Sequence, residues 1–200
     1  MKIRKGFTLM EMLVVIVTLG ILSAVMMFSS LEAVSSVDAN NIINNMQQIK
    51  MATYAWYKEN LSRIIPDKSQ GYKIRTKGVD QLCKEFIRDH QSEILQYLDT
   101  NTSLVLRAKN DSKGSNNIGE YALIALKNNK YWYVCYTLGK TSDIIDKYGS
   151  EAQELMIKRK IAGRAKTLNL SGKSSIDNDN MEETIYNDQI FVCMPILQLP

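Results

Sequence analysis

The chain has 200 residues, of which 45% are hydrophobic and 23% charged, and this composition suits one globular domain with or without an appendage. Ten Gly and three Pro exclude collagen-like and Pro-rich disordered chains. Twenty-five Lys and Arg against 21 Asp and Glu give a net charge of +4, but three of the basic residues lie within the first five. Residues 7–200 therefore carry 22 basic against 21 acidic side chains, which argues against a strongly basic nucleic-acid-binding protein.

The chain has a single histidine, His90, and this excludes most catalytic and zinc chemistry. Zinc sites that need two histidines and the iron facial triad cannot form. A Ser-His-Asp or Cys-His site would have to use His90. Because that residue follows Arg88 and Asp89, the sequence predicts that it lies on a solvated helix face. The chain is therefore not expected to be an enzyme.

The N-terminus combines a short basic stretch with a long apolar segment. Lys2, Arg4 and Lys5 come first, and Met12–Leu31 is a run of 20 residues without a formal charge. A helix of that length spans about 30 Å, the thickness of the hydrocarbon layer of a bilayer. We expect a transmembrane segment over about residues 9–31, with the basic stretch in the cytoplasm and the rest of the chain outside it.

Two features differ from an ordinary secretory signal. The distinctive small residue, Gly6, precedes the apolar run, whereas a cleavable signal has its small-residue site after it. The second feature is Glu11, an acid near the start of the apolar helix, where a charge is a functional hypothesis by default. A plain signal anchor and a signal cleaved near Ser23-Ala24 remain alternatives.

Residues 5–15, KGFTLMEMLVV, contain a Gly, an aromatic residue, Thr-Leu-x-Glu and the start of the apolar helix. This segment resembles the class III signal of type IV prepilins and pseudopilins. The resemblance implies that a prepilin peptidase cuts between Gly6 and Phe7 and that Phe7 becomes the N-methylated first residue. It gives Glu11 the role of the family's characteristic acid, paired with the N-terminal ammonium of a neighbouring subunit. The resemblance covers the first 30 or so residues only.

The charge pair implied for Glu11 is physically reasonable. Cleavage before Phe7 would create an ammonium at the edge of the apolar layer, where a carboxylate four residues further on is poorly solvated. An opposite charge within about 4–6 Å favours the ionised carboxylate. We therefore expect the pair to support assembly of the chain into a filament.

One long helix is predicted over about residues 7–60. No Gly or Pro occurs between Ile21 and Ile65, and the apolar pattern changes along this stretch from uniform to amphipathic. In the second half the apolar face recurs at spacings of three and four residues, through Ile42, Met46, Ile49, Thr53 and Trp56. The first half therefore needs lipid or other subunits, and the second half needs a domain to pack against.

Residues 61–200 are expected to form an α+β head, with additional helices and a small antiparallel sheet. With the long helix packed on that sheet, the architecture is pilin-like. The expected turn between the two central strands is Asn128-Asn129, because Asn tolerates a positive φ. Residues 170–180, LSGKSSIDNDN, are expected to be loop. The predicted elements are helices over about 78–98 and 142–162 and strands at 104–109, 121–127, 131–138 and 190–194.

All three cysteines, Cys83, Cys135 and Cys193, lie in the part expected outside the cytoplasm, where disulfides persist. Three thiols allow at most one intrachain bridge. Cys135 and Cys193 lie in two predicted strands, and the resemblance favours this pair, because many pilins fasten their C-terminal region in this way. The alternative is that all three are buried and reduced.

Two charged clusters are further candidates for binding. The densest basic patch consists of Lys158, Arg159, Lys160, Arg164 and Lys166. Such a patch could contact DNA phosphates, but a solvated helix face is the commoner explanation. The acidic stretch Asp177–Glu183, with Asp177, Asp179, Glu182 and Glu183, could suit calcium, although its spacing does not match an EF-hand. No other cofactor is indicated.

The resemblance implies a structural subunit of a type IV pilus or pilus-like filament. The partners would be the prepilin peptidase, sibling subunits through the 7–60 helix, and the assembly platform of the bacterial inner membrane with its motor ATPase. A pseudopilin of a type II secretion or DNA-uptake system is the alternative within the family. A membrane-anchored binding domain that does not assemble is the alternative outside it.

Overall fold

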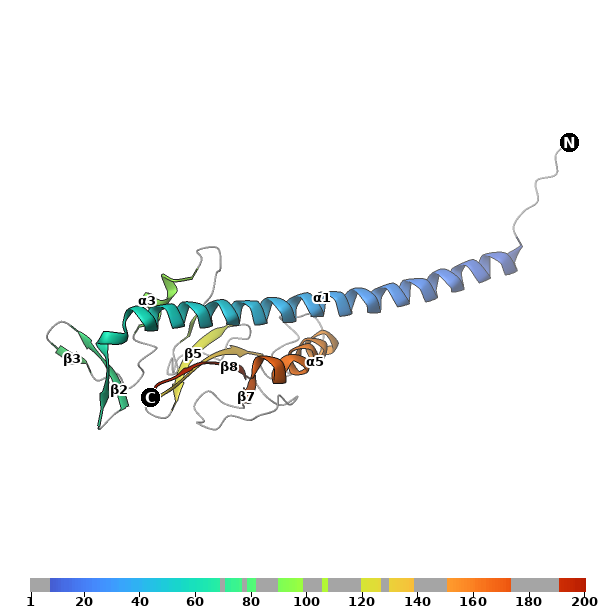
Figure 1. The fold of residues 1–200 in the computed structure, drawn as a ribbon. Coiled ribbons are helices and arrows are strands. Elements are labelled where there is room, and N and C mark those ends of the chain that lie inside the picture. The colour runs from blue at the N-terminus through green and yellow to red at the C-terminus, as the bar shows by residue number, and fades with distance from the viewer. Residues whose placement is uncertain are drawn as a thin grey trace.

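Figure 1 shows one long helix, α1, that extends well beyond a smaller head. The computed structural model describes residues 8–68, 71–76, 79–81, 90–98, 106–107, 120–126, 130–138, 151–173 and 191–200. Helix α1 spans Leu9–Glu59, and its 51 residues are about 77 Å long at 1.5 Å per residue. Its first half projects away from the head and its second half lies across it (Figure 1). The prediction of a single long helix is confirmed.

Both ends of α1 are capped by nearby side chains. At the start, Thr8 and Glu11 form a capping box, in which each side chain accepts a hydrogen bond from the backbone N–H of the other residue. At the end, Asn60 donates hydrogen bonds from its backbone N–H and its Nδ2 to the Trp56 carbonyl oxygen, at 3.0 and 2.9 Å. A short 3₁₀ helix, η1 (Leu61–Arg63), then leads into the first strand. With no Gly or Pro between Ile21 and Ile65, nothing interrupts the helix inside the head.

The head is built around a five-stranded sheet with the order β4-β5-β6-β8-β7. The pair β4·β5 is parallel and the other three pairs are antiparallel. The C-terminal strand therefore lies inside the sheet, between β6 and β7, rather than at its edge. The strands are β4 (Leu106–Arg107), β5 (Tyr121–Leu126), β6 (Tyr131–Thr137), β7 (Ser171–Lys173) and β8 (Phe191–Gln198).

The central hairpin β5–β6 and the C-terminal strand confirm three of the predicted strands. Leu126 pairs with Tyr131, so the chain reverses where the turn was expected, although Asn128-Asn129 itself lies outside the described residues. Strand β8 continues beyond the predicted end at residue 194. It does so through Pro195, which has no N–H to donate, and the register shifts at this point of the β6–β8 pair.

Both faces of the sheet are buried. Successive side chains of β5 point to opposite faces, so Leu123 joins the cluster that faces α1 while Ile124 joins the cluster on the other face. The predicted stripe of α1 supplies the helical side of the first cluster, including Met46, Ile49 and Trp56. Its sheet side includes Leu123, Trp132, Val134, Val192, Met194 and Ile196.

Helix α5 (Glu151–Leu168) packs against α1 and also enters this core through Ile157 and Ile161. The predicted helix over 142–162 has its end wrong by six residues, and residues 142–150 lie outside the described part. The helix ends where Asn169 takes a positive φ of 54° and the Leu170 N–H donates to the Ala165 carbonyl oxygen at 2.8 Å. The chain then enters β7, where a loop was expected over residues 170–180. The prediction was wrong at Ser171–Lys173, because local polarity could not show that β8 offers a pairing edge there, and residues 174–180 lie outside the described part.

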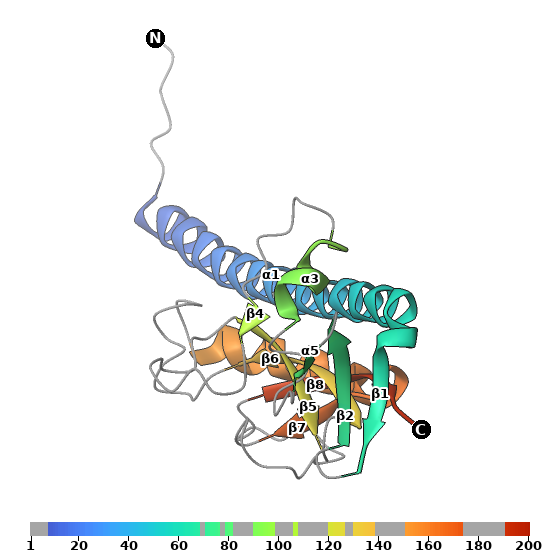
Figure 2. The ribbon, with the colours of Figure 1, turned by 90° about the vertical axis from the view of Figure 1, so that its left-hand side faces the viewer.

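A second, three-stranded antiparallel sheet follows η1, with the order β1-β2-β3 (Figure 2). Its strands are β1 (Ile64–Asp67), β2 (Gly71–Thr76) and β3 (Val79–Gln81). The predicted helix over 78–98 was wrong at its start, because Val79–Gln81 pairs with β2 instead. Only α3 (Gln91–Leu95) remains of it in the described part, and residues 82–89 lie outside. The strand expected at 104–109 is likewise described only at β4.

Candidate assembly segment and surfaces of the head

The first half of α1 is exposed on all sides. Every residue from Thr8 to Ser30 is exposed, and Leu31 is the first that is partly covered. Only α1, within the part of the chain that the structure describes, is long and apolar enough to cross a membrane, and its most apolar window is entirely uncovered. This segment is consistent with a single-pass membrane anchor. The large apolar side chains it exposes are Leu9, Met10, Met12, Leu13, Val14, Val15, Ile16, Val17, Leu19, Ile21, Leu22, Val25, Met26, Met27 and Phe28.

Glu11 lies at the N-terminal end of this segment and holds the helix start in place. Its Oε2 accepts hydrogen bonds from Thr8 N at 2.8 Å and from Thr8 Oγ1 at 2.9 Å, and Glu11 N donates to Thr8 Oγ1 at 3.3 Å. The other oxygen, Oε1, has no hydrogen bond to any residue that the structure describes. This capping role was not predicted from the sequence, although Thr-x-x-Glu before an apolar run is its usual signature. Gly6 and Phe7 lie outside the described residues.

The second half of α1 differs because one side of it is covered by the head. Ser35 is the first fully buried residue, and its Oγ donates to the Leu31 carbonyl oxygen at 2.8 Å. From Ala39 onwards the buried positions follow a helical spacing of three and four residues. The other side of the helix stays exposed at Val37 and Met51. The change from one environment to the other thus falls within about one helical turn.

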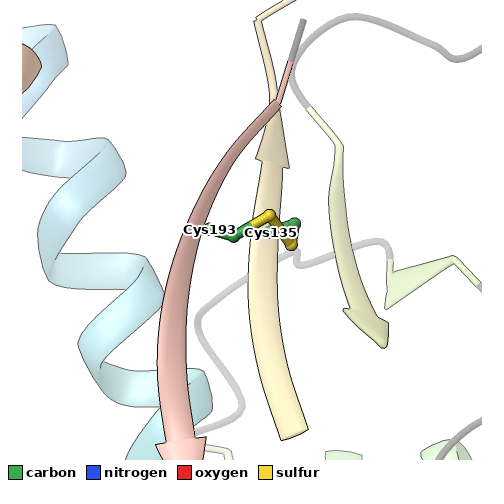
Figure 3. The surroundings of a disulfide bond; sticks show 2 residues. All are labelled: Cys135 and Cys193. Carbon is green, nitrogen blue, oxygen red and sulfur yellow. A yellow bond between two sulfur atoms is a disulfide. The ribbon is translucent and has the colours of Figure 1, made fainter. Parts of the chain in front are cut away.

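A disulfide joins Cys135 of β6 to Cys193 of β8 (Figure 3). The two residues lie directly opposite each other in the antiparallel pair, with their Cα atoms 4.0 Å apart. The bond therefore fastens the C-terminal strand to the centre of the sheet, and the predicted pairing is confirmed. Cys83 lies outside the described residues.

The basic patch is only partly a solvated face. Arg159, Lys160, Arg164 and Lys166 are exposed on α5, as expected. Lys158 is buried, and its ammonium pairs with the carboxylate of Glu154, which is buried as well. The prediction was wrong for this residue because its place on the helix directs it towards the core beside Ile157 and Ile161. A buried ion pair of this kind leaves Lys158 unsuited to contact phosphates.

His90 is also buried rather than solvated. Its ring stacks on Trp56 at a centroid distance of 5.5 Å, and its Nδ1 lies 3.1 Å from Glu93 Oε1. Trp56 Nε1 donates to Glu93 Oε2 at 2.9 Å, and Arg63 lies near the same oxygen. His90, Glu93 and Trp56 together fasten α3 to the end of α1. The prediction failed because the aromatic partner is 34 positions away in the sequence and only the tertiary fold brings it to His90.

The electrostatics of this cluster are dominated by Glu93. Partial burial alone would raise the pKa of Glu93. Three interactions oppose this effect and together lower the pKa below its ordinary value: the hydrogen bond from Trp56, the contact with His90 and the nearby Arg63. The carboxylate is therefore ionised at neutral pH. It serves as an acceptor and counter-ion that stabilises the packing.

An apolar groove of about 670 Å³ runs between α1, α5 and β8. Leu168, Met194 and Ile196 line it together with Met51 and Ala55 of α1. Its remaining lining residues are Gln47, Lys50, Tyr54 and Thr167. The groove is continuous with the uncovered side of α1.

The described residues contain no group of three or more His, Cys, Asp and Glu side chains that could hold a metal ion. The acidic stretch Asp177–Glu183 lies outside them, so the calcium hypothesis stays a prediction.

Comparisons of the chain with protein-family models, with curated proteins and with solved structures found no match.

Proposed function

We propose that this protein is a structural subunit of a type IV pilus or a pilus-like filament, processed after Gly6 and N-methylated at Phe7. The observation that carries the proposal is the two-part helix α1. Its first half is apolar and exposed on every side, whereas its second half forms part of the core of a disulfide-fastened head. The signal-like residues 5–15 precede and overlap the exposed half.

The exposed half of α1 must be covered by lipid or protein both before and after assembly. Burial of apolar surface is worth about 25 cal/mol per Å², so fifteen large exposed apolar side chains cannot remain in water. Lipid would cover them in the precursor, and the same segments of neighbouring subunits would cover them in a filament. If α1 stays helical while neighbouring subunits replace the lipid around it, the helix would carry the head from the membrane into the filament.

Glu11 fits the proposed charge pair between subunits. One of its oxygens is used by Thr8, and the other has no hydrogen bond within the described part of the chain. Helix α1 begins at Leu9, so an N-terminal ammonium on Phe7 would lie next to the N-terminal end of its own helix. A neighbouring subunit displaced along the filament axis would then bring its Glu11 within reach of this ammonium. Removing one partner of such a buried pair costs about 3–5 kcal/mol.

The processing is tested by intact-mass measurement and N-terminal sequencing of the full chain from sheared surface material and from membranes. We expect a chain that begins at N-methyl-Phe7 and is abundant in the sheared fraction. The same mature chain in membranes alone would indicate a minor subunit or a pseudopilin. An intact Met1–Gly6 leader in both fractions would contradict the proposal and leave a membrane-anchored domain that does not assemble.

The role of Glu11 is tested by two substitutions with different chemistry. Glu11→Gln removes the charge but keeps an acceptor for the capping box, whereas Glu11→Ala removes both. We expect both variants to insert into the membrane and both to be missing from filaments. Glu32→Gln is the matched control, because Glu32 is an exposed acid on the same helix whose surface ion pair is worth little. Normal assembly of Glu11→Gln, with loss only in Glu11→Ala, would show that capping rather than charge matters.

A further inference from the structure

The apolar groove between α1, α5 and β8 has a buried base and an exposed wall. Met194 and Ile196 of β8 are buried, so they form the base. Met51 and Tyr54 of α1 stand beside them and are 73% and 45% exposed. The volume of about 670 Å³ falls within the range of about 300–1,000 Å³ that small-molecule sites have. The groove is therefore large enough to take an apolar ligand.

The polar groups that line the groove include a cation and no acid. Lys50 is half-buried in the lining, and none of the ion pairs among the described residues uses it. Tyr54, Thr167 and Gln47 add two hydroxyl groups and an amide. A second cation lies close by, because Lys58 Nζ is 5.2 Å from the centre of the Tyr54 ring. An occupant with negative charge would complement this lining.

The position of the groove along α1 restricts where an occupant comes from. Met51 lies 20 positions beyond Leu31, the end of the uncharged run, which is about 30 Å along the helix axis. A lipid that stays in the bilayer therefore does not reach the groove. The uncharged run of a neighbouring α1, Met12–Leu31, is apolar but offers no acid to face Lys50. A soluble ligand that joins an apolar body to one anionic group fits both properties of the groove.

We propose that this groove binds a single-chain anionic amphiphile, such as a fatty-acid carboxylate. The alkyl chain lies over Met194 and Ile196, and the anionic group pairs with Lys50. Each CH₂ that the groove covers tightens binding by about fourfold. The ion pair lies at the edge of the groove, where it adds about fivefold. The inference rests on the groove alone, so it and the proposed filament function can fail independently.

The test uses the full chain in phosphatidylcholine nanodiscs, without detergent that would fill the groove. The probe is octane-1-sulfonate, whose charge does not change with pH. A myristoyl chain enters a bilayer with an association constant of only about 10⁴ M⁻¹, and each CH₂ fewer weakens this by about fourfold, so an octyl chain stays mostly in water. The readout is NMR of methionine methyl groups labelled with ¹³C. Met51 and Met194 report on the groove, Met26 on the bilayer segment, and Met156, which contacts Ser35, on the head away from the groove.

We expect octane-1-sulfonate to shift the Met51 and Met194 signals saturably while the Met26 and Met156 signals stay in place. Hexane-1-sulfonate should bind more weakly by about fourfold for each CH₂ removed. Octyltrimethylammonium, which has the opposite charge, should bind several-fold more weakly than octane-1-sulfonate.

The variant Lys50→Gln tests the anionic end of the site. We expect it to raise the Kd of octane-1-sulfonate about fivefold and to leave octyltrimethylammonium binding no weaker than before. The matched control is Lys68→Gln, which removes an exposed cation that does not line the groove and should behave as the parent does.

Four outcomes would overturn the proposal. The first is equal affinity for the anionic and the cationic amphiphile, and the second is an affinity that does not depend on chain length. The third is a shift of the Met26 signal without shifts of Met51 and Met194, because the probe would then enter only the bilayer. The fourth is a shift of Met51 and Met194 in discs that hold two copies of the chain, without any amphiphile, which would assign the groove to a neighbouring subunit.

Discussion

The two halves of α1 are one continuous helix in two different environments. Residues 9–30 are exposed and, apart from Glu11, carry no charge, whereas residues 32–59 show an apolar stripe that is buried against the sheet, α3 and α5. Both halves have the same helix geometry, so they differ in how apolar and polar side chains are distributed around the helix. The comparison teaches that an apolar helix without polar sides belongs to a lipid or multi-subunit environment, while a striped one belongs to its own domain.

The largest expected effect comes from a matched pair of methionines on the same helix. Met46 is fully buried, and Met46→Ala should lower the free energy of unfolding of the head by about 2–5 kcal/mol, because it leaves a cavity. Met26 is 67% exposed, and Met26→Ala should change the free energy of unfolding by less than about 0.5 kcal/mol. Urea titration of the full chain in detergent, followed by tryptophan fluorescence, measures both. Equal losses would mean that the first half is also packed on the head.

The next effect tests whether the head depends on the fastening of its C-terminal strand. The double variant Cys135→Ala/Cys193→Ala opens a loop of 58 residues, and we expect it to lower the free energy of unfolding by about 2–4 kcal/mol. The same titration measures it, and the reduced parent protein should fall by a similar amount. If β8 were held by its apolar contacts alone, neither treatment would shift the transition.

A smaller effect is expected at the start of the exposed half. Thr8→Ala removes the cap of α1 and should cost about 1 kcal/mol of local helix stability. Hydrogen exchange of the amides in the first turn should accelerate, while the amides of the head keep their protection. Thr8→Ser should restore the slow exchange, since it keeps the hydroxyl acceptor. An unchanged first turn would show that the surrounding detergent or lipid, not the cap, holds the helix end.

The smallest effect concerns the cluster that joins α3 to the end of α1. The pKa of Glu93 is lowered in the folded protein from 4.5, so its contribution to stability is present above that value and is lost as the pH falls through the lower folded value. Because Glu93 is partly exposed, we expect less than about 1 kcal/mol. The difference in urea midpoint between the parent and Glu93→Gln should shrink below pH 4.5. A difference that stays constant with pH would assign the role of Glu93 to hydrogen bonding alone.

The sequence by itself determined the features that depend on local pattern. The absence of Gly and Pro between Ile21 and Ile65, with the change from uniform to striped apolar residues, was enough to predict α1 and its two halves. The alternating and apolar runs at Tyr121–Leu126 and Tyr131–Thr137 were enough for the central hairpin. These predictions succeeded because helix and strand periods are visible within a short window.

Only the tertiary structure decided the features that depend on distant partners. Val79–Gln81 is a strand because β2 lies beside it, and Ser171–Lys173 is a strand because β8 does. His90 is buried because Trp56, 34 positions away, stacks on it inside the fold. Lys158 and Glu154 are buried together because α5 packs against α1 and turns this face towards the core. Pairing edges and buried partners are created by the chain returning to itself, so no local pattern could have shown them.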